Sequence, residues 1–242
     1  MIDYQMNQQD YDQLVNQTIE YVKAEMSSND SSHDFHHIQR VRHLAKFIAI
    51  TEGLTQDDQL IVELGALLHD LKDWKYCADE IAGADAARKF LSQENVPVEI
   101  IDQICHIIAN IGFSKEVGTQ NTPRDDDRQT ITPFEVVQDA DRLDALGAIG
   151  IARCLTYGGA KNNILYDPNI SVREHLNEKE YKNGKSTTIN HFPEKLFKLT
   201  DLMKTPTGKQ IANHRHQLMV DYYQQFLKEW EALDVSPDPN RK

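Results

Sequence analysis

Apolar residues recur every three to four positions along most of the chain, which is the spacing of one face of an α-helix. The pattern is clearest in residues 14–26, 38–48 and 60–68. Turn or cap residues separate these stretches, including Gly53 and Thr55. No pair of alternating segments flanks a hairpin turn. The pattern therefore predicts an all-α fold without an internal repeat.

Further apolar periodicity predicts helices at three more places: residues 84–93, 97–111 and 134–157. The last of these helices is expected to run unbroken through Gly147 and Gly150 and to end at Gly158 and Gly159. No strand precedes this glycine pair, so we interpret it as a helix terminator and not as a phosphate-binding loop.

The C-terminal third of the chain differs from the rest in composition and in apolar periodicity. Residues 160–191 are rich in Asn, Lys and Glu and show little periodicity, which predicts a flap over the helices. A helical extension is expected over residues 190–233. We interpret residues 1–242 as one domain, with a core at about 30–160.

Composition narrows the class of protein. With 242 residues, of which 40% are hydrophobic, the chain can bury a sizeable core. No apolar run approaches the roughly 20 residues of a membrane helix, and no signal peptide is expected. Three widely spaced cysteines favour a reducing, cytoplasmic location. The net charge of −12 argues against a nucleic-acid partner, although a few local cations could still hold a small phosphorylated substrate.

Metal-binding side chains follow the apolar stretch 60–68, because His69 and Asp70 stand next to each other at its end. Adjacent residues on a helix lie about 100° apart, so both side chains can reach one ion. Upstream, His37 shares a helix face with apolar residues and should point to the core. Asp34 lies one turn before His37 and could hold its far ring nitrogen.

Three carboxylates lie inside an otherwise apolar helix at Asp139, Asp141 and Asp144. Asp141 and Asp144 share a face, and Asp139 points elsewhere. Buried carboxylates at this density need partners. Imidazole and carboxylate ligands together suit a divalent first-row metal.

These segments resemble the HD-domain superfamily of metal-dependent phosphohydrolases, and in particular a single-domain bacterial subfamily. The resemblance extends over five segments: residues 34–41, 66–70, 138–150, 191–196 and 203–205. It implies an HD helical bundle with metal ligands at His37, His69, Asp70 and Asp141. Asp139 is the alternative fourth ligand, and Asp34, Asp139 and Asp144 would support the ligands from outside.

The resemblance also bears on the number of metal ions. Binuclear relatives carry several extra histidines between the His-Asp pair and the last Asp, whereas residues 71–140 here contain His106 alone. A single ion is therefore expected. Mn²⁺ suits a mixed nitrogen and oxygen ligand set with open positions, while Co²⁺, Ni²⁺, Mg²⁺ and Fe²⁺ stay open as alternatives.

The resemblance further implies an acid-base group one turn after His69, which would be Asp73, with Lys72 beside it. Such a carboxylate would orient or deprotonate a water whose pKa the metal lowers toward ~7. Cations must balance the charge of the phosphate. The candidates nearest in sequence or on the flap are Arg40, Lys72, Arg142, Lys115, His191 and Lys195.

The activity that the resemblance implies is hydrolysis of a nucleotide, and the leading hypothesis is that a nucleoside triphosphate gives a monophosphate and pyrophosphate. Removal of phosphate from a nucleoside 5′-monophosphate is the next hypothesis. Phosphodiesterase action on a cyclic nucleotide or alarmone is another, and a non-catalytic ligand-binding module is a hypothesis of a different kind. The oligomeric state is left open, a homodimer included.

Overall fold

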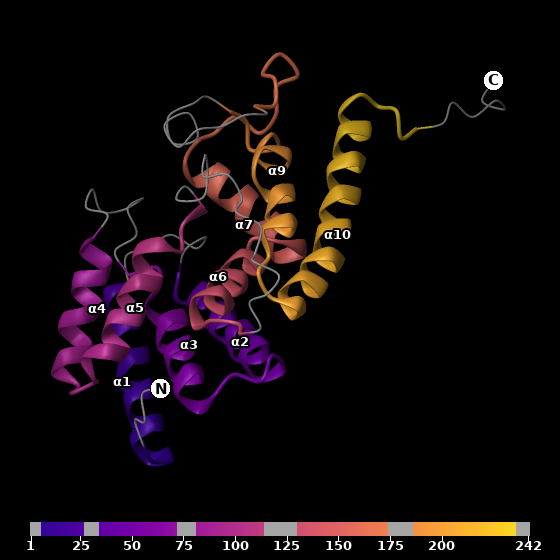
Figure 1. Cartoon of the computed structure of the whole chain (residues 1–242). Helices are drawn as coiled ribbons and strands as arrows, with labels where there is room; N and C mark the ends of the chain where they lie inside the picture. The colour runs from indigo at the N-terminus through magenta and orange to yellow at the C-terminus, as the bar shows by residue number, and fades with distance from the viewer. Residues whose placement is uncertain (1–5, 27–33, 72–80, 114–129, 174–185, 236–242) are drawn as a thin grey trace, which may run out of the picture.

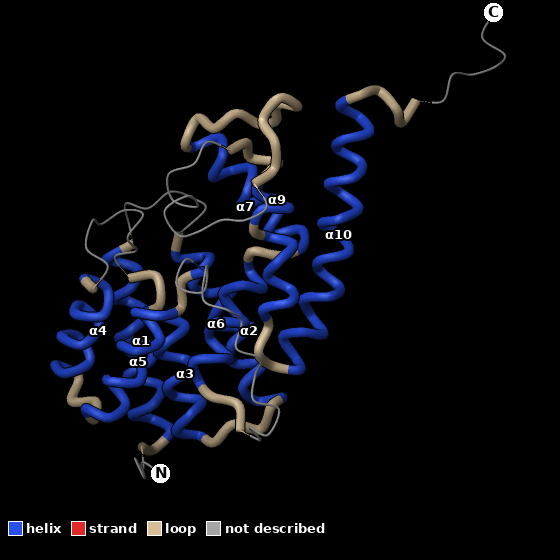
Figure 2. The backbone as a smooth tube through the Cα atoms, turned by 45° about the horizontal axis from the view of Figure 1, so that its top comes forward, coloured by secondary structure: helices blue, strands red, loops and turns tan. Residues whose placement is uncertain are grey.

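The computed structural model describes residues 6–26, 34–71, 81–113, 130–173 and 186–235 (Figure 1). Within these residues the chain forms helices joined by turns and loops and contains no strand (Figure 2). The elements are α1 (Gln8–Glu25), α2 (Phe35–Thr51), α3 (Gln56–Leu68), α4 (Ala82–Gln93), α5 (Val98–Asn110), α6 (Pro133–Asp144), α7 (Gly147–Ala160), α9 (His191–Glu194), the 3₁₀ helix η2 (Leu196–Leu202) and α10 (Pro206–Trp230). The predicted all-α fold is confirmed. None of the described helices has the length and apolar character needed to cross a membrane.

Threonine side chains cap the N-termini of three helices and so fix where these helices begin. Thr55 accepts a hydrogen bond from the backbone N–H of Asp58 at the start of α3. Thr132 forms a reciprocal capping box with Glu135 at the start of α6, and Thr205 caps α10. Each cap satisfies backbone N–H groups that have no partner within the helix.

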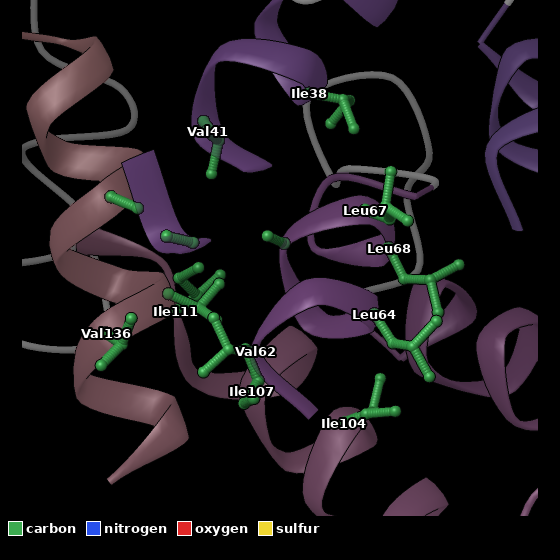
Figure 3. Packing of buried hydrophobic residues seen from close by; sticks show 14 of the residues in the cluster. Ile38, Val41, Val62, Leu64, Leu67, Leu68, Ile104, Ile107, Ile111 and Val136 are labelled. Carbon is green, nitrogen blue, oxygen red and sulfur yellow. The ribbon is translucent and has the colours of Figure 1, made fainter. Parts of the chain in front are cut away.

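The core is built around α3, whose residues from Leu60 to Leu68 are all buried. Helices α1, α2, α5 and α6 pack against it, and α2 also packs along α6. Figure 3 shows side chains from several of these helices meeting in the core: Ile38, Val41, Val62, Leu64, Leu67, Leu68, Ile104, Ile107, Ile111 and Val136. This packing holds the start of α2 and the ends of α3 and α6 in fixed relative positions.

The structure corrects the expectation of one helix over residues 134–157, which is divided into α6 and α7. Leu146 is extended, with φ −115° and ψ 158°, and Gly147 has φ +71°. Glycine adopts this left-handed conformation without strain. The turn also brings backbone close to Gly150, where a Cβ would lie 2.2 Å from the carbonyl oxygen of Ala145.

The glycine pair does not end α7, which continues to Ala160. Gly158 instead allows a close approach, since a Cβ there would lie 2.3 Å from Oγ1 of Thr188. The described part of the predicted flap, residues 161–173 and 186–190, consists of turns and loops. The long helix α10 lies along one side of the molecule and packs on α6, α7 and η2 (Figure 1).

Candidate metal centre

Three helix ends supply the side chains of the candidate metal centre. His37 lies in the first turn of α2, whose N-cap is Asp34. His69 caps the C-terminus of α3 and Asp70 follows it. Asp141 lies in the last turn of α6. Because α2 packs on both α3 and α6, these ends meet although they lie far apart in the chain.

The ligand atoms of these side chains face one another. The two Nε2 atoms of His37 and His69 are 3.3 Å apart. Oδ1 of Asp141 lies 3.5 Å from Nε2 of His37 and 3.6 Å from Nε2 of His69. Oδ2 of Asp70 lies 3.6 Å from Nε2 of His37. The ligand atoms of His37, His69 and Asp70 all lie within 4.8 Å of one another.

The outer nitrogens of both imidazoles are held by hydrogen bonds. Nδ1 of His37 donates to Oδ2 of Asp144 at 2.7 Å. Nδ1 of His69 lies 2.9 Å from the carbonyl oxygen of Ala66, which can only accept, so this nitrogen donates. Both Nε2 atoms are thereby left to face the centre. Such outer partners fix the ring orientation and tautomer of metal-binding histidines.

Burial differs between the two kinds of ligand. The His37 and His69 side chains are each 1% exposed, whereas the Asp70 and Asp141 side chains are 15% and 32% exposed. The imidazoles thus form the inner wall of the cluster, and Asp141 lies at its solvent-facing edge.

Charge and burial act against each other in the cluster. Burial lowers the pKa of His37, although the hydrogen bond to Asp144 opposes this effect. Burial also disfavours a charged His69, but Asp141 and Asp70 outweigh it and raise the pKa of His69 to about 9. Desolvation would raise the pKa of Asp141, yet His69 and His37 hold it well below its usual range. The carboxylates therefore demand a positive charge beside them, which a divalent cation would supply.

The donor set fits such a cation. It offers two imidazole nitrogens and two carboxylate groups, a mixture found around divalent first-row metals. Two ligands that each lie ~2.1 Å from one ion are roughly 3.0–3.4 Å apart. Four separations, His37–His69, His37–Asp70, His37–Asp141 and His69–Asp141, are 3.3–3.6 Å and come close to this range.

Two residues expected to support the ligands have different roles. Asp34 caps α2 by accepting from the backbone N–H of His37 at 3.1 Å and does not hold the ring; Asp144 does that. Asp139 points away, accepting hydrogen bonds from the N–H groups of Lys204 and Thr205 and from the Thr205 hydroxyl. Its carboxylate anchors the start of α10, so the geometry favours Asp141 as the fourth ligand.

The two arginines expected to bind substrate, Arg40 and Arg142, make different contacts. Arg40 forks onto Asp144, with Nε 2.7 Å from Oδ1 and Nη2 3.0 Å from Oδ2. Arg142 is only 4% exposed and donates to the carbonyl oxygen of Leu202 at 2.6 Å, which corrects its expected role in substrate binding. Its guanidinium instead ties α6 to η2.

The remaining candidates lie on the C-terminal segment or outside the described residues. His191 begins α9. Lys195 follows α9 and places Nζ 5.3 Å from the centre of the Phe113 ring. Lys72, Asp73 and Lys115 lie outside the described residues, so their expected roles stay predictions.

Two arginines near the centre are not among the site residues expected from the sequence. Arg153 on α7 places Nη1 3.1 Å from Oδ2 of Asp144, and Arg215 on α10 donates to the carbonyl oxygen of Leu143 at 2.5 Å. Arg153 is the sole charged residue of α7, which is a usable signal. Arg215 stands among polar residues of a long surface helix, where no pattern marks it.

Comparison with known proteins places this helical fold and its cluster in a known class. The HD domain model matches residues 34–146. YpgQ of Bacillus subtilis is 32% identical over 219 residues, which cover 89% of this chain and 93% of YpgQ. A structure of YpgQ in complex with ADP superposes with a TM-score of 0.66, at 34% identity over 89% of this chain and 97% of that one.

Two further solved structures have a fold similar to that of this chain. A Lactobacillus plantarum protein has a TM-score of 0.78 at 35% identity and covers 94% of this chain and 100% of its own. An HD-superfamily hydrolase from Bacillus thuringiensis has a TM-score of 0.68 at 38% identity and covers 92% and 99%. The chain belongs to the HD-domain superfamily of hydrolases, as the motifs predicted. HD domains bind divalent metals, and the cluster of His37, His69 and Asp70 is present here.

Proposed function

We propose that this protein is a metal-dependent phosphohydrolase that acts on nucleotides through one divalent ion. His37, His69, Asp70 and Asp141 would hold the ion. The observation that carries the proposal is the convergence of their ligand atoms, with both imidazole Nδ1 atoms already engaged by outer partners. When bound there, the ion would supply a water of lowered pKa and would polarise a phosphoryl oxygen.

We propose a single ion, because the described residues offer no second group of histidines, and we favour Mn²⁺ as the metal. His106, the one histidine between residues 71 and 140, is exposed on α5 and lies 3.2 Å from the Asn110 side chain, on the same helix. A ligand set of two nitrogens and two oxygens with open positions suits Mn²⁺. The protein residues bind and orient: Asp144 fixes the ring of His37, and Arg40 fixes Asp144.

A nucleotide is the proposed substrate because the related YpgQ was solved with ADP bound. The favoured reaction is hydrolysis of a nucleoside triphosphate to a monophosphate and pyrophosphate. Asp73, one turn after His69 in the sequence, is the proposed acid-base group, with Lys72 beside it.

The test uses metal-stripped protein supplied with Mn²⁺ and a panel of nucleoside mono-, tri- and cyclic phosphates and an alarmone, with products separated by chromatography. We expect pyrophosphate release from triphosphates. His69→Ala and Asp70→Ala should lower turnover by more than about 100-fold, since losing even an outer partner of a metal ligand costs 10–100-fold.

The matched control is His106→Ala, which removes an exposed imidazole that contacts Asn110 of its own helix and should leave turnover unchanged. Release of phosphate from monophosphates would replace the favoured reaction by the phosphatase alternative. Turnover of no substrate, or ligand variants as active as the parent, would refute the proposal.

A further inference from the structure

Three arginine side chains converge on the C-terminal end of α6, beside the candidate metal centre. Arg40 comes from α2, Arg153 from α7 and Arg215 from α10. Arg40 and Arg153 lie 2.7 and 3.1 Å from the carboxylate of Asp144, and Arg215 reaches the carbonyl oxygen of Leu143. Helices far apart in the chain thus bring three guanidinium groups to one helix end.

These three residues, Arg40, Arg153 and Arg215, are called the arginine cluster, and Asp144 connects the cluster to the candidate ligand His37. Oδ2 of Asp144 contacts both Nδ1 of His37 and Nη1 of Arg153, so one carboxylate separates this arginine from a ligand ring. The side chains of Arg40 and Arg153 are 34% and 16% exposed, so a solute can reach both.

The backbone is shaped to admit Arg215. Gly147 has φ +71°, and a Cβ there would lie 3.0 Å from Cγ and 3.1 Å from Cβ of Arg215. The missing side chain lets the stem of Arg215 lie against the turn between α6 and α7. The guanidinium then ends beside Leu143 and within electrostatic reach of Asp144.

Among the side chains that the structure describes, the positive charge of this cluster exceeds the negative charge beside it. Arg40 and Arg153 contact the buried carboxylate of Asp144 and Arg215 contacts the carbonyl oxygen of Leu143, while a divalent ion would offset Asp70 and Asp141. Asp34 adds one further negative charge, which acts on Arg40. The described side chains around the loaded site therefore keep an excess of positive charge, although the chain as a whole carries −12.

We propose that Arg153 and Arg215, together with Arg40, bind the phosphate chain of the substrate and select nucleotides with two or more linked phosphates over monophosphates. Guanidinium forks match phosphate oxygens, and groups arriving from three helices can contact more than one phosphate. The identity of the substrate as a nucleotide rests on the proposed function. The anion selectivity can be measured without turnover.

The probes are two anions that cannot be hydrolysed, methylenediphosphonate and methylphosphonate, titrated as Mn²⁺ complexes into Mn²⁺-loaded protein by calorimetry. We expect the parent to bind the diphosphonate at least about tenfold more tightly. Arg153→Gln and Arg215→Gln should each weaken diphosphonate binding by about tenfold, the scale of one charged hydrogen bond, and change methylphosphonate binding little.

Matched measurements separate phosphate binding from support of the metal. Mn²⁺ affinity should stay within about threefold of the parent in Arg153→Gln and Arg215→Gln, a smaller change than losing a ligand's outer partner causes. Arg88→Gln removes an exposed arginine paired with Asp102 and should change neither anion. Arg153→Lys and Arg215→Lys keep the charge without the fork and should give intermediate affinities.

The proposal is overturned if the parent binds both anions equally, or if the Gln variants lose Mn²⁺ and both anions together. A normal diphosphonate preference in Arg153→Gln overturns it even if Arg215→Gln does not fold. Diphosphonate selectivity that depends on these arginines, in a protein that hydrolyses no nucleotide, would refute the proposed function and leave the anion site standing.

Discussion

Asp144 accepts hydrogen bonds or ion pairs from three side chains, His37, Arg40 and Arg153, while only 2% of its own side chain is exposed. Burial alone would raise the pKa of this carboxyl, but its hydrogen bonds from His37 and Arg40 lower the pKa to about 2. Asp144 is therefore an anion at any pH near neutrality. It fixes the ring of His37 before a metal binds.

Asp144→Asn tests this positioning role. The neutral amide cannot satisfy two guanidinium groups and the Nδ1–H of His37 together, so the ring should lose its fixed orientation. We expect Mn²⁺ affinity, measured by calorimetry, to fall 10–100-fold. Asp102→Asn, which changes an aspartate with 59% of its side chain exposed, should leave the affinity unchanged. A Mn²⁺ affinity within about threefold of the parent would contradict the role.

Single residues were predictable from the sequence where a pattern fixes their face. The spacing of Asp141 and Asp144 placed both carboxylates on one side of α6, and both do contact His37. Asp34 was misassigned because an aspartate before a helix can either cap the backbone or reach a side chain one turn on. Arg142 was misassigned because its direction depends on η2, which packs from 60 residues away.

Among the elements, α1, α2 and α3 are linked by one buried carboxylate in addition to their apolar packing. Glu63 on α3 accepts from the Tyr11 hydroxyl of α1 and contacts Arg42 and Lys46 of α2, at 2.7 and 2.6 Å. Burial would raise the pKa of Glu63, but its hydrogen bonds to these three partners outweigh it and lower the pKa below the ordinary value of 4.5. The ionised form thus stabilises the fold.

Glu63→Gln should lower the free energy of unfolding at pH 7 by about 3 kcal/mol, the lower end for breaking a buried pair, because Arg42 and Lys46 keep some contact with water. A lowered pKa in the folded state adds stability above pH 4.5, which is lost as the pH falls further. The difference between parent and variant should therefore shrink below that pH. Urea unfolding at several pH values measures it.

The control is Glu20→Gln, which breaks an ion pair whose glutamate side chain is 73% exposed and should cost less than about 1 kcal/mol. Equal losses in the two variants, or a difference that grows on acidification, would contradict the assignment of Glu63.

The positions of most helices can be predicted from apolar periodicity, but the boundary between α6 and α7 cannot. Apolar periodicity located α2, α3 and α5, because their buried faces follow the helical repeat. The same periodicity runs across α6 and α7 and conceals the turn at Leu146. Gly147 could have been a tolerated helical glycine or a turn, and only the packing of Arg215 against it decides for the turn.

At the scale of the whole molecule, the candidate site brings together segments that lie far apart in the chain. Its four proposed ligands come from α2, the end of α3 and α6, and His37 and Asp141 are 104 positions apart in the sequence. The sequence could supply the ligand types and their order. The convergence of the three helix ends follows from the burial of α3, which no local pattern specifies.

Binding of a metal to these helix ends should therefore stabilise the entire fold. At a free Mn²⁺ concentration about 100 times Kd, linkage adds about 2.7 kcal/mol. For a domain of this size, that corresponds to a rise in Tm of about 5–10 °C. Thermal unfolding of chelator-treated protein with and without Mn²⁺ measures the shift. His69→Ala should abolish it and His106→Ala should retain it. A shift of equal size in His69→Ala and the parent would mean that Mn²⁺ stabilises the protein from another place, and the ligand assignment would then be wrong.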